Sequence, residues 1–182
     1  MKRKSFRKVD GLKYGWLKSA KKIMILLIAV FVILRLAVGI SFVKGDSMEP
    51  TLYDGELVFY RRISFGYKPG DVVSVRIPSG EYYLKRIIAV AGDTVEIRDG
   101  KVYRNGTPLE EPYAVGETLE QEGAVRYPIT LQEGQLFVMG DNRAQSMDSR
   151  SFGVVGTRQI KGKILLRVGW AYLKAVSSVS QN

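Results

Sequence analysis

The 182-residue sequence contains no cysteine and no histidine. Without cysteine, the chain can form neither a disulfide framework nor a thiol nucleophile, and it cannot bind zinc through thiolates. Without histidine as well, a conventional metal site and a Ser-His-Asp triad are both excluded. We therefore expect no metal and no cofactor, and any hydroxyl nucleophile must be activated by another kind of side chain.

Acidic residues are scarce at one end of the sequence, and this end carries most of the net charge of +10. Residues 1–22 hold nine Lys and Arg residues and a single acid, Asp10, whereas residues 44–182 hold 18 basic and 17 acidic residues. Domains that bind nucleic acids carry clustered Lys and Arg on their folded surface. The near-neutral balance after residue 44 argues against a nucleic-acid partner.

An apolar stretch, residues 23–43, follows the basic segment, and Arg35 is its only charged residue. As one helix these 21 residues would be about 31 Å long, close to the thickness of a hydrocarbon core. An arginine at mid-membrane costs about 2.5–3.5 kcal/mol, but Arg35 lies past the centre, where it can snorkel outward. We predict a single-pass transmembrane anchor over residues 23–43.

The basic residues before this stretch also predict its orientation, because positive residues stay on the cytoplasmic side. We expect a cell-membrane protein with a cytoplasmic N-terminus, an extracytoplasmic C-terminal domain and the lipid bilayer as one partner. Two alternatives remain open. Ala37-Val38-Gly39 resembles a signal-peptide processing site, and the stretch could also be a buried core helix.

The rest of the chain has the pattern of an all-β protein. From Leu57 onward, short runs rich in β-branched and aromatic residues alternate with turn signals. Asp99-Gly100 and Asn105-Gly106 are typical hairpin dipeptides. No segment after residue 44 has a helical period over ten residues. A mainly β fold, either a barrel or a sandwich, is therefore predicted.

Residues 107–130 are polar, acidic and punctuated by Pro and Gly, which is typical of an insertion. This segment divides the β-rich part of the sequence. The predicted parts are a basic cytoplasmic tail (1–22), the anchor (23–43), a β core (44–92 and 135–175), an inserted β cap (93–134) and a C-terminal tail (176–182).

One serine and one lysine stand out as a candidate pair. Ser47 lies in GDSMEPTL (45–52), directly after the apolar stretch, and Lys85 lies in YYLKRIIAVAG. A lysine with a pKa of about 10.4 is protonated at neutral pH, but burial can lower this pKa by several units. In a strand, Lys85 shares a face with Tyr83 and Ile87. The pattern alone favours a solvated lysine and an ordinary turn serine.

Three segments together resemble the bacterial type I signal peptidases, the Ser-Lys dyad leader peptidases. They are GDSMEPTL (45–52), YYLKRIIAVAGD (82–93) and GDNRAQSMDSRSFG (140–153), in this order after the apolar stretch. The resemblance implies a signal-peptidase-like, LexA-related β core with a smaller β cap, preceded by one transmembrane helix. It also implies a serine endopeptidase that removes signal peptides from exported preproteins after small residues, in an Ala-x-Ala pattern.

The same resemblance implies roles for individual residues. Ser47 matches the nucleophile, Lys85 the general base, and Ser146 a serine that helps to orient the lysine. Supporting positions behind the site are matched by Asp148, Arg150, Asp141 and Arg143. Pocket-lining positions are matched by Val43, Met48, Leu52, Tyr83 and Leu84, although all five residues could equally be plain core.

Gly45 departs from the pattern of some family members, which carry Ser or Thr there to assist the oxyanion hole. Gly45 has no hydroxyl, so the Ser47 backbone N–H, with a neighbouring amide or water, would have to stabilise the oxyanion. Loss of one such donor costs about 2.7–4 kcal/mol in other hydrolases.

Three other functions compete with that of a signal peptidase. LexA-type repressors share the Ser-Lys chemistry but carry a DNA-binding domain in front, where this chain has an apolar stretch. A non-catalytic, anchored assembly module of the same fold is disfavoured by the presence of both Ser47 and Lys85, whereas a specialised pilin-assembly member of the fold stays open. A membrane-tethered β module unrelated to peptidases would leave the three motifs as coincidence.

Overall fold

The structure, a computed structural model, describes residues 6–121 and 125–169. It divides into two compact units, Met1–Val38 and Gly39–Asn182. Four predicted segments lie wholly or partly outside the described residues: the start of the basic tail (1–5), a part of the inserted cap (122–124), the end of the core (170–175) and the C-terminal tail (176–182).

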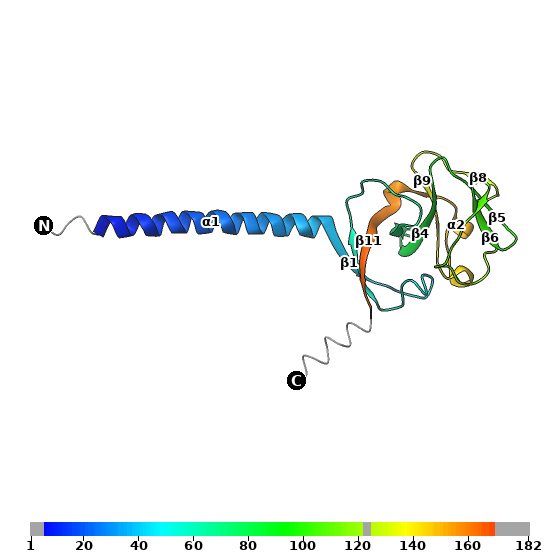
Figure 1. The fold of residues 1–182 in the computed structure, drawn as a ribbon, viewed down its shortest axis with the longest axis horizontal. Coiled ribbons are helices and arrows are strands. Elements are labelled where there is room, and N and C mark those ends of the chain that lie inside the picture. Colours follow the sequence, from blue (N-terminus) through cyan, green and yellow to red (C-terminus); the bar gives the residue numbers. More distant parts are fainter. Residues whose placement is uncertain (1–5, 122–124, 170–182) are drawn as a thin grey trace, which may run out of the picture. The chain divides into compact units, whose positions relative to one another are not determined.

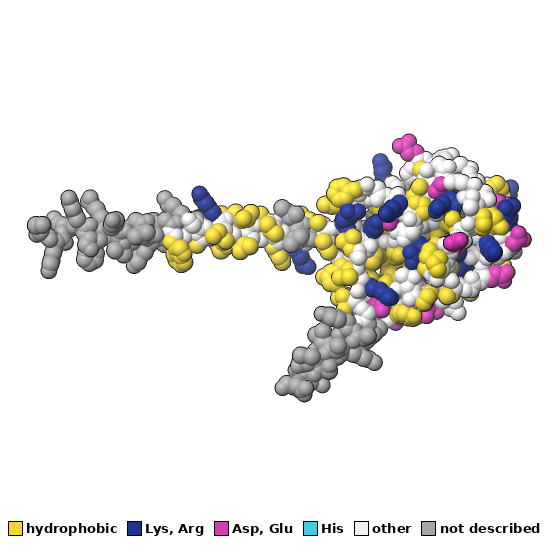
Figure 2. Space-filling view, viewed as in Figure 1, with side chains coloured by type: hydrophobic (Ala, Val, Ile, Leu, Met, Phe, Trp, Pro, Cys, Tyr) yellow, Lys and Arg dark blue, Asp and Glu magenta, His cyan; other side chains and the backbone are white. Residues whose placement is uncertain are grey.

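The first unit is dominated by one helix, α1 (Phe6–Ala37). Its described apolar side chains are largely exposed, among them Ile23, Leu27 and Phe31, and they cover much of its surface in Figure 2. Among the described residues, no helix combines the length and the apolar character that a membrane crossing requires.

The C-terminal boundary expected for a helix over residues 23–43 was wrong. The helix already begins at Phe6, within the basic segment, and residues 38–42 form strand β1 (Val38–Phe42) instead of continuing it. Close packing explains the strand at Gly39. A Cβ built on this glycine would lie 2.2 Å from the Tyr60 ring, so the strand can pack against Tyr60 there because residue 39 has no side chain.

The second unit is mainly β, as the alternating pattern predicted. Its larger sheet has seven strands in the order β1-β2-β11-β3-β4-β9-β10. The bounds are β1 (Val38–Phe42), β2 (Leu57–Arg61), β3 (Val72–Arg76), β4 (Tyr82–Val90), β9 (Gln135–Met139), β10 (Val155–Gly156) and β11 (Ile160–Val168). The longest helix described after residue 44 is α2 (Ser149–Phe152), which has four residues.

A smaller sheet lies within the segment predicted as an inserted cap. Its order is β7-β6-β5-β8, with β5 (Thr94–Arg98), β6 (Lys101–Arg104), β7 (Thr107–Pro108) and β8 (Ile129–Thr130). Both predicted hairpin dipeptides are turns between its strands: Asp99-Gly100 joins β5 to β6, and Asn105-Gly106 joins β6 to β7. All four residues have positive φ, as such turns require.

The two sheets share a hydrophobic core and are therefore not separate compact units. Ile88 and Phe137 of the large sheet pack in one cluster with Val95 and Val102 of the small sheet. In Figure 1 the small sheet lies at the end of this unit away from β1 and β11. The connection between the sheets brings the loop after β7 back to the large sheet, where Val115 bridges Asn142.

Strand β4 holds the central position for function. It pairs with β3 along Tyr82–Arg86, but with β9 only from Arg86 onward. The first part of β4 therefore has no strand partner on its β9 side among the described residues. Antiparallel register places Lys85 opposite Val73 of β3, in the middle of the large sheet.

Candidate active site

Ser47 lies in a turn that follows β1 and returns the chain to β2. Within this turn the Glu49 N–H donates to the Asp46 carbonyl at 3.0 Å, and the Leu52 N–H donates to the Met48 carbonyl at 2.9 Å. Met48 and Leu52 are 1% and 3% exposed and anchor the turn in the core, while Ser47 stays half-buried. The fold thus holds the serine hydroxyl at the edge of a packed segment.

Lys85 lies against this hydroxyl. Its Nζ is 2.7 Å from Ser47 Oγ, although 38 residues separate the two in the sequence. The lysine is 1% exposed, and its Nζ also lies 5.4 Å from the centroid of the Tyr83 ring on the same face of β4. The structure therefore brings together the two residues that the motifs singled out.

Burial lowers the pKa of the Lys85 ammonium from 10.5 to about 8. The Asp148 carboxylate opposes this lowering of the pKa, and so do the weaker contributions of Asp141 and Asp46, whereas the Arg150 guanidinium adds to it. None of the described carboxylates lies within ion-pair distance of Nζ. Removal from water without a paired counter-charge favours the neutral amine.

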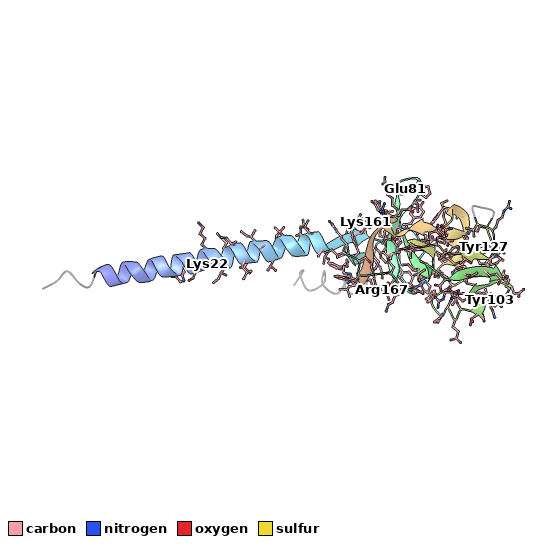
Figure 3. The ribbon with its side chains drawn as sticks, turned by 90° about the horizontal axis from the view of Figure 1, so that it is seen from above. Lys22, Glu81, Tyr103, Tyr127, Lys161 and Arg167 are labelled. Atoms are coloured by element: carbon pink, nitrogen blue, oxygen red, sulfur yellow. The ribbon has the colours of Figure 1, made fainter. Side chains whose placement is uncertain are left out.

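A cleft of about 610 Å³ runs past the pair. One wall comes from residues 41–48, and the other from Glu81 and the first part of β4, Tyr82–Lys85, which has no strand partner on its β9 side among the described residues. Gln145, Met147 and Lys161 complete the lining, together with Ser74. Figure 3 labels Glu81 and Lys161 on the β11 side of the unit, away from Tyr103 of the small sheet.

Four of the five predicted pocket residues line this cleft, namely Val43, Met48, Tyr83 and Leu84. The fifth, Leu52, does not reach it. Leu52 packs beneath the turn in a core cluster with Val43, Met48 and Val58. Leu52 is therefore a plain core residue, which was the alternative for all five positions. The buried Val43 and Met48 belong both to the core and to the cleft wall.

Ser146 is close to the nucleophile, but it makes no contact with the lysine of the kind predicted. It is 5% exposed, and its Oγ has no hydrogen-bond partner among the described residues. This hydroxyl lies against Gly140, where a built Cβ would be 2.2 Å from Ser146 Oγ and 2.5 Å from the Ser47 carbonyl oxygen. Its predicted role in orienting Lys85 remains a prediction.

The predicted supporting residues form three buried ion pairs behind the cleft. Asp148 pairs with Arg150 at 2.9 Å, caps α2 and accepts the Gly140 N–H at 3.0 Å. The Arg150 guanidinium also donates to the Arg143 carbonyl at 2.7 Å. This network fixes the segment that carries Ser146 from behind.

Asp141 and Arg143 do not pair with each other; each pairs with a residue that sequence reasoning missed. Asp141 accepts from Arg86 Nε and Nη2 at 2.8 and 2.6 Å and from the Thr51 hydroxyl. Arg143 pairs with Glu111 at 2.7 Å. The strand alternation that places Arg86 on the face opposite Lys85 was the one available signal for the first pair. Nothing local pointed to Glu111, which lies 32 residues from Arg143.

Gly45 adopts φ +79°, and a Cβ built on it would meet nothing within 4 Å. Its N–H donates to Asp54 Oδ1 at 2.7 Å. The space is open, but the left-handed backbone disfavours any other residue. The absence of a hydroxyl at this position therefore suits the local conformation. Within the part of the chain that the structure describes, no group of acidic side chains could hold a metal ion.

The chain is similar to known proteins over most of its length. The family described as "Signal peptidase, peptidase S26" matches residues 16–170. Signal peptidase I of Bacillus licheniformis is 35% identical over 171 residues, which cover 87% of this chain and 89% of that protein. Signal peptidase IB of Staphylococcus aureus is 33% identical over 162 residues, covering 80% and 85%.

A solved structure is also similar. It is the crystal structure of a signal peptidase I from Enterococcus faecalis V583, which is 30% identical to this chain. The TM-score is 0.48, and the match covers 57% of this chain and 100% of that chain.

Proposed function

We propose that this chain, which belongs to the signal peptidase family, peptidase S26, and is a signal peptidase I, cleaves preproteins with Ser47 as nucleophile and Lys85 as general base. One observation carries the proposal: Lys85 Nζ lies 2.7 Å from Ser47 Oγ, and the lysine is 1% exposed. This distance is within the range at which a base takes a proton directly.

Acylation is the first half of the proposed reaction. The neutral amine of Lys85 takes the proton of Ser47 Oγ as this oxygen attacks the scissile carbonyl carbon. The carbonyl oxygen becomes an oxyanion, which the Ser47 backbone N–H stabilises. The carbon–nitrogen bond then breaks, and the protonated lysine gives its proton to the leaving amine.

Deacylation uses the same two residues in reverse. Lys85, again neutral, takes a proton from a water molecule that attacks the ester carbon of the acyl-enzyme. The carbon–oxygen bond to Ser47 breaks, and the proton on the lysine returns to Oγ. A pKa of about 8 suits both steps, because the amine must accept and release a proton near neutral pH.

The substrates proposed are signal peptides with small residues, in an Ala-x-Ala pattern, before the cut. This proposal is supported by the cleft next to Ser47, whose lining includes the side chains of Met48, Leu84 and Tyr83. Replacing the Ala at the cut with Leu in the substrate adds three carbon atoms and is expected to lower kcat/KM by at least about 10–200-fold, the factor for a single extra methylene in a fitted pocket.

Membrane anchoring through the N-terminal segment is part of the same proposal, with the catalytic unit outside the cytoplasm. The exposed apolar side chains of α1 and the basic residues before them support it. An anchored enzyme and a substrate inserted in the same bilayer meet at a raised effective concentration. Retention of the full chain in carbonate-washed membranes would test the anchor.

The catalytic proposal is tested with the full chain and a preprotein that carries an Ala-x-Ala site. Ser47→Ala and Lys85→Ala are each expected to abolish processing, because one removes the attacking oxygen and the other its base. Lys101→Ala, at an exposed lysine of the small sheet, is the matched control and should process normally. Processing by Ser47→Ala or Lys85→Ala at the wild-type rate would reject the dyad.

A further inference from the structure

The amide of Ser47 is the main-chain donor that the proposed oxyanion hole depends on, because Gly45 offers no hydroxyl. A donor contributes most when it is already aimed at the developing charge before the reaction begins. What fixes the direction of the Ser47 N–H is therefore a question about the peptide that joins Asp46 to Ser47.

Asn142 contacts this part of the turn twice, from the segment after β9. Its backbone N–H donates to the Ser47 carbonyl at 3.1 Å. Its side-chain Nδ2 reaches the preceding carbonyl, that of Asp46, at 3.4 Å. The Asp46 carbonyl also accepts the Glu49 N–H within the turn, so Asn142 is its one described donor from outside the turn.

The geometry of a peptide bond turns this contact into a direction for the neighbouring N–H. The peptide between Asp46 and Ser47 is trans and planar, so its C=O and N–H point to opposite sides. The carbonyl faces Asn142, which does not line the cleft, whereas Ser47 does. The Ser47 N–H therefore points away from Asn142.

Asn142 is itself firmly placed. The Val115 N–H donates to the Asp141 carbonyl and the Arg143 N–H to the Val115 carbonyl, both at 2.9 Å, so Val115 holds the residues on each side of Asn142. On the Ser47 side, Gly140 leaves no spare room, since a Cβ there would be 2.5 Å from the Ser47 carbonyl oxygen. The support behind the Ser47 turn thus comes from a rigid segment.

We propose that Asn142 is a positioning residue for the oxyanion hole: its side-chain amide holds the Asp46 carbonyl and so aims the Ser47 N–H into the cleft. The inference rests on the proposed function of Ser47 as nucleophile. It assigns to Asn142 an effect on the transition state and none on substrate binding, because Asn142 does not line the cleft.

Two variants test this role in the full chain. Asn142→Ala removes the side-chain donor, and Asn142→Asp keeps the shape but places an acceptor opposite the Asp46 carbonyl; both keep the backbone N–H that holds Ser47. Removing a whole oxyanion donor lowers kcat by about 10²–10³-fold. A donor that remains but is less well oriented should cost less, so kcat is expected to fall about 10-fold in each variant. KM should change by less than about twofold.

A peptidyl boronic acid adds a readout that a purely structural role would not move. Its tetrahedral adduct with Ser47 resembles the oxyanion intermediate, so its inhibition constant should rise by the same factor as kcat/KM falls. Rates are expressed per active site, titrated with the same inhibitor, so that misfolded enzyme does not count. Gln132→Ala, at an exposed residue before β9, is the control and should match wild type.

Unchanged kcat in both Asn142 variants, with Ser47→Ala and Lys85→Ala inactive, would overturn the inference and leave the proposed function standing. A rise in KM at constant boronate affinity would also overturn it, since Asn142 would then act on substrate binding. Cleavage by Ser47→Ala at the wild-type rate would overturn both.

Discussion

Lys85 and Arg86 are consecutive residues of β4, and their side chains lie on opposite faces of the strand. The cleft face holds Lys85, which is 1% exposed and has no described carboxylate within ion-pair distance. The other face holds Arg86, whose guanidinium makes two hydrogen bonds to Asp141 and lies 3.9 Å from the centroid of the Tyr113 ring. Two neighbouring cations therefore meet opposite electrostatic conditions.

The direction in which each pKa shifts depends on whether the cation has an ion-pair partner and not on burial alone. Burial lowers the pKa of Lys85 to about 8 because the nearby carboxylates are too distant to offset it. Burial would also lower the pKa of Arg86, but the hydrogen bonds and charge of Asp141 outweigh it and raise the pKa. One face of β4 thus prepares a neutral base, while the other uses a permanent charge to tie β4 to the loop after β9.

The largest effect is expected when Lys85 is replaced by Met, which fills similar space without an amine. Loss of the base should lower kcat by at least about 10⁴-fold. The free energy of unfolding at pH 7 should nevertheless increase by about 2–3 kcal/mol, because the native state no longer contains a desolvated ammonium. Preprotein cleavage and urea denaturation measure the two quantities.

The sign of the stability change can be checked against pH. The native pKa of Lys85 lies below its unfolded value, so between about pH 8 and 10.5 the unfolded wild-type chain binds more protons than the native one. Wild-type stability therefore rises through this range relative to Lys85→Met, and the advantage of the variant should shrink. A Met variant that is less stable than wild type at pH 7 would contradict the assigned burial.

The mirror experiment replaces Arg86 by Met and should have the opposite effect on stability. It leaves the Asp141 side chain, which is fully buried, without its ion-pair partner. Breaking one side of a buried pair costs about 3–5 kcal/mol, here in the free energy of unfolding measured by urea denaturation. Equal stability changes for the Lys85 and Arg86 variants would remove the contrast between the two faces.

The pH dependence of catalysis sharpens the contrast on the cleft face. About half of Lys85 is neutral at pH 8 and about one hundredth at pH 6, so kcat/KM should fall about 50-fold from pH 8 to pH 6. Below about pH 7 Lys85 adds little pH dependence to the stability, because it is then largely protonated in both the native and the unfolded state. A profile that is flat between pH 6 and 8, in enzyme shown to stay folded, would rule out Lys85 as the titrating base.

Strand β4 also shows which features of the structure could be predicted from the sequence. Alternation predicted that Lys85 shares a face with Tyr83 and that Arg86 points the other way, and the structure agrees. Periodicity also predicted the mainly β fold and both hairpins of the small sheet, since local backbone preferences decide these features. Resemblance then selected Ser47 among the many serines.

The partners of the charged residues could not be predicted in the same way. Asp141 meets Arg86 because β9 pairs with β4, and Arg143 meets Glu111 because the loop after β7 returns to the large sheet. Both depend on strand order, which periodicity does not give. The end of α1 was missed for a similar reason: Gly39 packs against Tyr60, a contact made only once β1 joins the sheet.

The smallest effect is expected from two variants of Tyr113, which separate the contribution of its ring from that of its hydroxyl. Tyr113→Leu removes the aromatic face beneath the Arg86 guanidinium and the hydrogen bond from the hydroxyl to Glu111, which is 2.9 Å long. Tyr113→Phe removes only the hydrogen bond. A cation–π contact of this kind contributes about 0.5–2 kcal/mol, so the Leu variant should be less stable than the Phe variant by about 1 kcal/mol. Equal unfolding free energies for the two variants would mean that the hydrogen bonds of Arg86, to Asp141, Gly70 and Thr51, hold it without the ring, and that the ring only fills space.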